Sequence, residues 1–166
     1  MHKIRAALVA ASVTAAAGTL LVGPAQAAPD GVAGPNCDRL YRLYTNNPQG
    51  GDGYVRAYDA VDCNEQIGAA QGNDDNWNDT AGPFRSPSND KATSLLNTGT
   101  YSGGVNNVQF WENKDAGGHT GCLRRGELYV DDLRDNTLAE DDGSKINANN
   151  KISSHSWSSG CSNPLT

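Results

Sequence analysis

Two short segments of the sequence carry oxygen-bearing side chains at the same spacing. They are Asn89-Asp90-Lys91-Ala92-Thr93-Ser94, here called box 1, and Asn149-Asn150-Lys151-Ile152-Ser153-Ser154, here called box 2. Amide, carboxylate and hydroxyl oxygens, together with backbone carbonyls, are the ligands that Ca²⁺ prefers. The same residue types also stabilise tight turns by bonding their own backbone. The boxes therefore predict either calcium sites or turns without a metal.

Each box follows a segment in which an aromatic residue precedes a glycine by seven positions. Tyr44 and Gly51 stand in this relation before box 1, and Trp111 and Gly118 before box 2. The order of turn and then box occurs twice, which indicates that residues from about 37 to 97 and from about 106 to 158 are two copies of one unit.

This doubled pattern resembles the βγ-crystallin family in its microbial, calcium-binding form. The family signature is aromatic-x4-aromatic-x-Gly, followed later by Asx-Asx-x-x-Ser/Thr-Ser. Both boxes match in full, whereas Gln49 and Ala116 replace the second aromatic residue of the two turns. The resemblance covers nearly all of the chain from residue 37 onward. It implies an all-β, two-motif Greek-key sandwich.

The resemblance also implies that each calcium ion is shared between the two motifs. The expected side-chain ligands are Asn89, Asp90, Thr93, Asn149, Asn150 and Ser153, and Lys91 and Lys151 would contribute their carbonyls. Thr45 and Glu112 follow the aromatic residues of the turns and are further candidates. Few charged ligands usually mean weak binding, and Asp90 is the one carboxylate in the boxes, so we expect a Kd of about 10⁻⁵ to 10⁻³ M.

Four cysteines divide evenly between the two halves of the chain. Because Cys37 and Cys63 fall in the first and Cys122 and Cys161 in the second, we expect the disulfides Cys37–Cys63 and Cys122–Cys161. The competing reading is a zinc site. No pair of cysteines has the C-x2-C spacing common in such sites, so we favour disulfides.

Catalytic patterns are weak. The histidines beyond residue 30 are His119 and His155, and the sequence lacks a Gly-x-Ser-x-Gly elbow. The acidic pairs at 131–132 and 141–142 are typical of solvated loops rather than of paired acid and base groups. The run from Asp74 to Asp79 resembles an EF-hand loop but lacks its glycine and its final glutamate, so we interpret it as a solvated acidic loop. We expect no enzyme.

The elements that position these residues are predicted to be short strands. Apolar, β-branched and aromatic runs bounded by turn residues predict strands at 40–44, 54–58, 108–111 and 128–130. The segments 71–80 and 131–145 are polar and predict surface loops, with one helical turn supported by Leu133 and Leu138.

The N-terminus is typical of an export signal. Lys3 and Arg5 precede an apolar run, and Ala25-Gln26-Ala27 is a cleavage box. We therefore expect a signal peptide at 1–27, a flexible leader at 28–36 and one domain at 37–166, secreted from the cell. Losing two basic residues and no acid changes the formal charge from −6 to −8. An acidic surface disfavours nucleic acid and anionic membranes.

The expected function is calcium binding by a secreted, monomeric, non-enzymatic domain. The resemblance also extends to secreted bacterial metalloproteinase inhibitors, a branch of the same fold. The domain could inhibit extracellular proteases as well as bind calcium. A metal-independent inhibitor of metalloproteases and a killer-toxin-like antimicrobial protein are the alternatives, because fold does not fix function.

Overall fold

The computed structural model describes residues 34–100 and 102–165. The predicted signal peptide and residues 28–33 of the predicted leader lie outside these ranges. Within them, no helix is long and apolar enough to cross a membrane.

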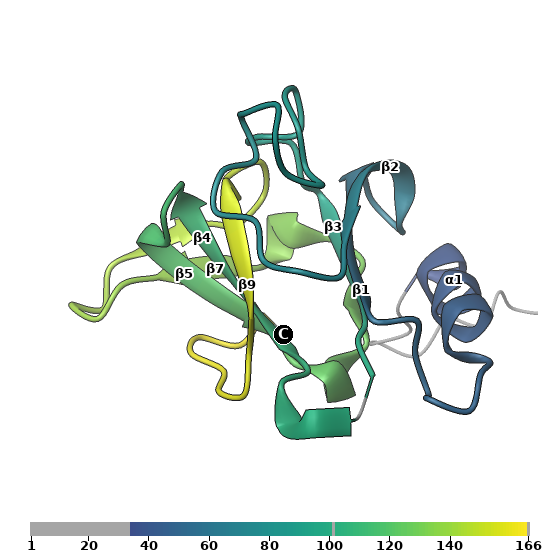
Figure 1. The fold of residues 1–166 in the computed structure, drawn as a ribbon. Helices are drawn as coiled ribbons and strands as arrows, with labels where there is room; N and C mark the ends of the chain where they lie inside the picture. Colours follow the sequence, from purple (N-terminus) through teal and green to yellow (C-terminus); the bar gives the residue numbers. More distant parts are fainter. Residues whose placement is uncertain (1–33, 101, 166) are drawn as a thin grey trace, which may run out of the picture. The chain divides into compact units, whose positions relative to one another are not determined.

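The described chain forms two antiparallel sheets (Figure 1). The first contains β1 (Tyr54–Ala60), β2 (Asn64–Ala70), β3 (Ser94–Thr98) and β6 (Tyr129–Val130), in the order β2-β1-β3-β6. The second contains β4 (Asn107–Asn113), β5 (Gly117–Leu123), β7 (Thr137–Ala139), β8 (Lys145–Asn147) and β9 (Ser154–Ser158), in the order β8-β7-β5-β4-β9. Three of the four predicted strands are therefore present, at β1, β4 and β6.

Each motif contributes a segment to the sheet that the other motif mainly forms. Strand β6 belongs to the second motif but pairs with β3 of the first. In return, Asp74 of the first motif forms a β-bridge with His155 in β9, with backbone bonds of 3.0 and 2.8 Å in the two directions. This exchange confirms the predicted all-β, two-motif Greek-key sandwich, and it brings the two boxes to the same region.

The core lies between the sheets and includes a segment that the sequence places on the surface. Trp77 is fully buried and stacks on the fully buried Phe84, with ring centroids 4.1 Å apart. Gly68 of β2 makes room for this pair, because a Cβ there would lie 2.1 Å from the Phe84 ring. The prediction of a solvated loop at 71–80 is thus wrong for Asp74 and Trp77. The loop has no regular secondary structure, but it runs across the core and buries the side chains of Asp74 and Trp77 there.

Residues 40–44 form part of a helix rather than the predicted strand. Helix α1 (Pro35–Thr45) begins with proline in its first turn and carries an Asp38–Arg42 ion pair of 2.8 Å at i, i+4 spacing. Its apolar face packs on Leu96 and Tyr58 and consists of Cys37, Leu40, Tyr41 and Tyr44. These positions follow helical rather than strand periodicity. The helix also takes up residues 35 and 36, the end of the predicted leader.

Both predicted disulfides are present. Cys37–Cys63 joins α1 to the turn after β1, and Cys122–Cys161 joins β5 to the C-terminal tail. The tail continues past the predicted end of the second motif, and Leu165 is buried in the core. Short 3₁₀ turns complete the fold at η1 (Ser102–Gly104), η2 (Arg125–Glu127) and η3 (Leu133–Asp135). The last of these is the predicted helical turn, although Leu133 and Leu138 are buried rather than on a surface loop.

Candidate metal sites

Boxes 1 and 2 lie against each other with near twofold symmetry. The Asp90 amide donates to the Ile152 carbonyl at 3.1 Å, and the Asn150 amide donates to the Ala92 carbonyl at 2.9 Å. Asp90 and Asn150 both have left-handed backbone conformations, with φ of 54° and 56°. Asn and Asp adopt this region more readily than other residues with side chains, which gives one local reason for an Asx at the second position of each box.

The hydroxyl at the fifth position of each box points to the Asx at the second position of the other. Thr93 Oγ1 lies 3.3 Å from Asn150 Oδ1, and Ser153 Oγ lies 3.2 Å from Asp90 Oδ1. The structure therefore brings together two pairs of oxygens, and each pair draws one member from each motif. We call them pair A (Ser153 and Asp90) and pair B (Thr93 and Asn150).

The final serine of each box has a different role. Ser94 Oγ and Ser154 Oγ are buried and donate to the carbonyls of Ala60 and Asn113, both at 2.7 Å. These carbonyls belong to the ends of β1 and β4, so the two serines hold the boxes to the hairpins. They are structural, and the hydroxyls open to a metal are those one residue earlier.

The aromatic residue of the first motif is Tyr58, not Tyr44 as the sequence spacing predicts. The Thr93 amide donates to the Tyr58 carbonyl at 2.7 Å, as the Ser153 amide donates to the Trp111 carbonyl at 2.9 Å. Counting seven residues on from Tyr58 reaches Glu65, which has a φ of 59°, whereas Trp111 leads to Gly118 with a φ of 72°. Glutamate in a position that usually holds glycine hides the first turn from a sequence pattern.

This reassignment changes one of the further candidate ligands. Thr45 lies at the end of α1, where its hydroxyl donates to the Tyr41 carbonyl at 2.8 Å. The residue that follows the aromatic in the first motif is Asp59, and Lys91 Nζ of box 1 lies 3.7 Å from its carboxylate. Glu112 of the second hairpin lines a hollow together with Lys151 and Ser153 of box 2, so both hairpins present a carboxylate next to a box.

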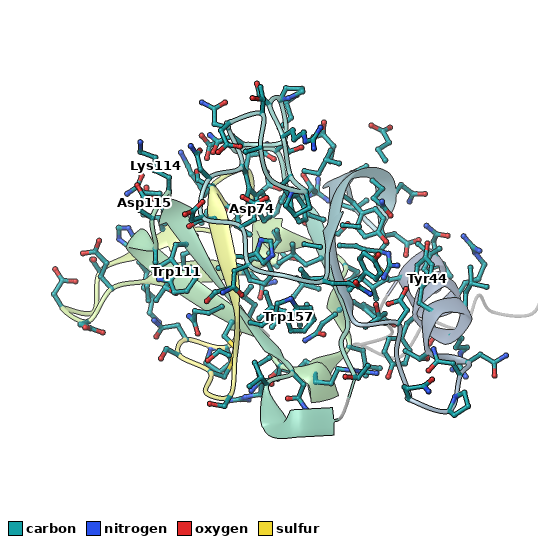
Figure 2. All side chains as sticks on the ribbon, viewed as in Figure 1. Tyr44, Asp74, Trp111, Lys114, Asp115 and Trp157 are labelled. Carbon is teal, nitrogen blue, oxygen red and sulfur yellow. A yellow bond between two sulfur atoms is a disulfide. The ribbon has the colours of Figure 1, made fainter. Side chains whose placement is uncertain are left out.

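A hollow of about 600 Å³ opens beside pair A. Its lining is rich in oxygen and includes Asn76, Asn78, Asn89, Asp90, Glu112, Asn113, Asp115 and Ser153, with Lys114 and Lys151 at the same hollow. Figure 2 labels Lys114 and Asp115 on the turn between β4 and β5. The positive charges of the two lysines disfavour the binding of a cation in this hollow, whereas three carboxylates and several amide oxygens favour it.

The oxygen atoms of the boxes fit a hard cation. Asn149 Oδ1 is buried and has no hydrogen-bond partner within the described residues. A buried amide oxygen without a partner is costly, and a metal ion would satisfy it. The fit relies on amide, hydroxyl and carbonyl oxygens, because the described residues contain no cluster of three His, Cys, Asp or Glu side chains able to hold a metal.

His119 joins Glu112 to Ser144. Its Nδ1 lies 2.7 Å from Glu112 Oε2, and its Nε2 lies 3.1 Å from Ser144 Oγ. The hydrogen bond to His119 lowers the pKa of Glu112. Hydrolases use a serine, a histidine and a carboxylate that are hydrogen-bonded in this order. Here Glu140 lies 3.7 Å from His119 Nδ1, and the Ser144 amide donates to the Asp142 carboxylate. This nearby negative charge would destabilise the oxyanion that forms in such a reaction.

His155 is a core residue held in its neutral form. It is 1% exposed, its Nδ1 accepts from Trp77 Nε1 at 2.9 Å, and its Nε2 donates to the Gly72 carbonyl at 3.1 Å. Burial lowers the pKa of His155 to about 4. His155 directly follows box 2 in the sequence, and its polar neighbours there gave no indication of its burial.

We expect acid to destabilise the domain through His155. Between its native pKa of about 4 and its unfolded pKa of about 6.5, only the unfolded chain binds the proton. Stability therefore falls as the pH drops through this window, by about 2–3 kcal/mol between pH 7 and 4.5. Urea titration at both values, with chelator present, measures the loss. His155→Gln keeps an acceptor and a donor and should remove most of this dependence, whereas His119→Gln should retain it. An equal loss in the His155 variant would contradict the assignment.

Comparisons with known proteins bear on the fold alone. No family model matches the sequence, and no curated protein matches it. A solved structure from work on the evolution of the eye lens βγ-crystallin domain fold is similar with a TM-score of 0.45 and 20% sequence identity. The match covers 64% of this chain and 85% of that chain. The strand exchange and the reciprocal contacts of the boxes describe a two-motif Greek-key domain independently of this likeness.

Proposed function

We propose that this chain is an exported, non-enzymatic domain that binds two calcium ions where its two motifs meet. One observation carries the proposal: the hydroxyl of each box lies within 3.3 Å of the Asx oxygen of the other box, in two symmetric pairs. An ion at pair A or pair B would take ligands from both motifs. Calcium binding would then stabilise the contact between the motifs.

The two sites differ in charge. Pair A contains the Asp90 carboxylate, with Glu112 lining the same hollow. Pair B contains only neutral side-chain oxygens, with Asp59 nearby and engaged by Lys91. Because charge on the ligands strengthens calcium binding, pair A is the tighter site.

The proposed export is supported by the N-terminal pattern and by the two disulfides, because disulfides persist in oxidising compartments. Protease inhibition stays a prediction, since no contact or surface of the described residues favours it over calcium binding.

The test is thermal and chemical unfolding with and without calcium. At free calcium ten times the Kd, one occupied site adds about 1.4 kcal/mol to the free energy of unfolding. Ser153→Ala and Thr93→Ala each delete one hydroxyl, so each should shrink the calcium-dependent gain. Asp90→Asn should weaken binding more than either.

Ser159→Ala is the matched control, because it removes an exposed hydroxyl just beyond β9, at the end of that strand opposite to box 2. Its calcium-dependent gain should equal that of the unmodified protein. Calorimetry counts the sites. If the unmodified protein unfolds identically in calcium and in chelator and calorimetry shows no heat, the boxes only form turns.

A further inference from the structure

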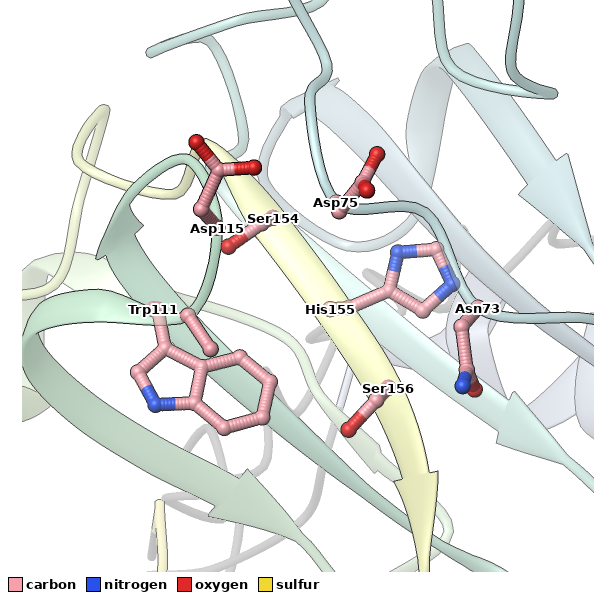
Figure 3. Close-up of a pocket in the computed structure, with 8 residues that line it drawn as sticks. Asn73, Asp75, Trp111, Asp115, Ser154, His155 and Ser156 are labelled. Atoms are coloured by element: carbon pink, nitrogen blue, oxygen red, sulfur yellow. The ribbon is translucent and has the colours of Figure 1, made fainter.

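Two hollows lie on either side of Trp111, and carboxylates line both. The first, of about 510 Å³, has strand β9 as its floor and contains Asp75 and Asp115 (Figure 3). The second, of about 490 Å³, contains Glu140, Asp141 and Asp142. Trp111 and Ala116 line both hollows. The two form one surface, here called the Trp111 groove.

The groove carries negative charge without compensation from its lining. Neither hollow is lined by lysine or arginine. His155 lines the first hollow, but burial lowers its pKa to about 4, so it adds no positive charge at neutral pH. Asp75, Asp115 and Asp141 are exposed, and their side chains make no ion pair or hydrogen bond with other described residues. A ligand with several positive charges is the complement of this surface.

The aromatic ring of Trp111 further restricts the chemical class of the ligand. Trp111 is half-buried, with hollows on two sides and no hydrogen bond from its indole nitrogen among the described residues. Tryptophan is the best aromatic partner for a cation on its face, and a planar guanidinium stacks there while it pairs with carboxylates. A single metal ion fits less well, because the described residues contain no cluster of three carboxylate, histidine or cysteine groups close enough to hold one. Carboxylates spread along a groove suit charges spread along a chain.

The backbone holds the two walls of the first hollow in place. The Asp115 amide donates to the Asp75 carbonyl at 2.8 Å, which ties the β4–β5 turn to the loop that crosses the core. The Trp157 amide donates to Asn73 Oδ1 at 2.9 Å, which ties the same loop to β9. The groove therefore exists before a ligand arrives, which lowers the entropy cost of binding.

We propose that the Trp111 groove binds an arginine-containing basic segment of a partner protein, with one guanidinium against Trp111 and the flanking basic residues facing the two sets of carboxylates. The groove shares Asp115 with the hollow beside pair A, whereas the boxes supply none of its five carboxylates, so the variants are also titrated with calcium alone to separate the two proposals.

The probe is the peptide acetyl-(Gly-Arg)₃-amide, titrated by calorimetry and tryptophan fluorescence in 50 mM NaCl with 1 mM CaCl₂. The same peptide with citrulline in place of arginine keeps the shape and loses the charge. We expect the arginine peptide to bind at least tenfold more tightly than the citrulline peptide. The double variant Asp75→Asn/Asp115→Asn should weaken arginine binding at least tenfold. Asparagine also tolerates the left-handed conformation of Asp115, so the turn is retained.

Asp135→Asn is the matched control, because it removes one exposed charge on η3, outside both hollows. It should change arginine binding less than twofold. Equal binding of the citrulline peptide would overturn the proposal, as would an equal loss in Asp135→Asn, which would indicate diffuse attraction to an acidic surface. Binding of a neutral oligosaccharide such as cellohexaose, with no binding of the arginine peptide, would assign the groove to carbohydrate instead.

Discussion

The Trp77→Ala variant is expected to lose about 3–5 kcal/mol of unfolding free energy, as is typical when a buried Trp is reduced to Ala. Trp77 is fully buried, stacks on Phe84 and meets the Phe110 ring edge-on at 6.4 Å. Its removal leaves a cavity between the sheets. It also leaves His155 Nδ1, which accepts from the indole nitrogen at 2.9 Å, without a donor.

Denaturant unfolding of Trp77→Ala and Trp77→Phe separates the two contributions. Phenylalanine keeps a stacking ring but loses the N–H group and some volume, so it should cost less than alanine. Trp157→Ala is the control, because Trp157 is only partly buried against the same core. A loss below about 1 kcal/mol in Trp77→Ala would place it among surface substitutions and contradict the packing of the 71–80 segment.

The burial of Trp77 could not be predicted from the sequence. This residue stands among asparagine and aspartate, so composition alone indicates a solvated loop. The structure turns this segment into the first motif's contribution to the second sheet. The Trp77 amide donates to the Ser153 carbonyl as the Leu133 amide donates to the Thr93 carbonyl, at 2.9 and 2.8 Å. Because these bonds join residues far apart in sequence, local pattern does not contain them.

The boxes were predictable because their chemistry is local. The left-handed Asx and the hydroxyl three residues later recur at fixed spacing, and that spacing is visible in the sequence. The first hairpin was missed because Glu65 occupies the left-handed position that Gly118 holds in the second. The helix was missed because residues 40–44, taken as a short run of apolar and aromatic residues, match the composition of a strand. The helical spacing emerges only when the buried Cys37 is included.

Removing both disulfides is expected to leave the domain mostly unfolded. Loop-closure entropy assigns about 3.5 kcal/mol to a loop of the size closed by Cys37–Cys63 and about 4 kcal/mol to one of the size closed by Cys122–Cys161. The two loops do not overlap in sequence, so the losses should add. Their sum is comparable with the 5–15 kcal/mol that holds a typical domain folded.

The two double variants should each loosen a different part of the domain, either the C-terminal tail or α1. In Cys122→Ser/Cys161→Ser, the tail keeps the bond from the Leu165 amide to the residue 122 carbonyl at 2.9 Å and the bond from the residue 122 amide to the Asn163 carbonyl at 3.0 Å, but it loses its covalent tie to β5. The Leu165 amide hydrogen should then exchange faster than in the unmodified protein. In Cys37→Ser/Cys63→Ser, the amides of Asn36 and Cys37 still donate to Asp62 Oδ1 at 2.9 Å, yet α1 should exchange its amide hydrogens faster.

Denaturant titration of the unmodified protein with and without dithiothreitol measures the joint effect. We expect reduction to lower the free energy of unfolding by about 7.5 kcal/mol, by the same entropy estimate. The single-pair variants serve as controls that should each lose about half of this. If the reduced protein keeps its full stability, the estimate is contradicted. The packing of α1 and of the tail, rather than the constraint that the disulfides place on the unfolded chain, would then account for the stability.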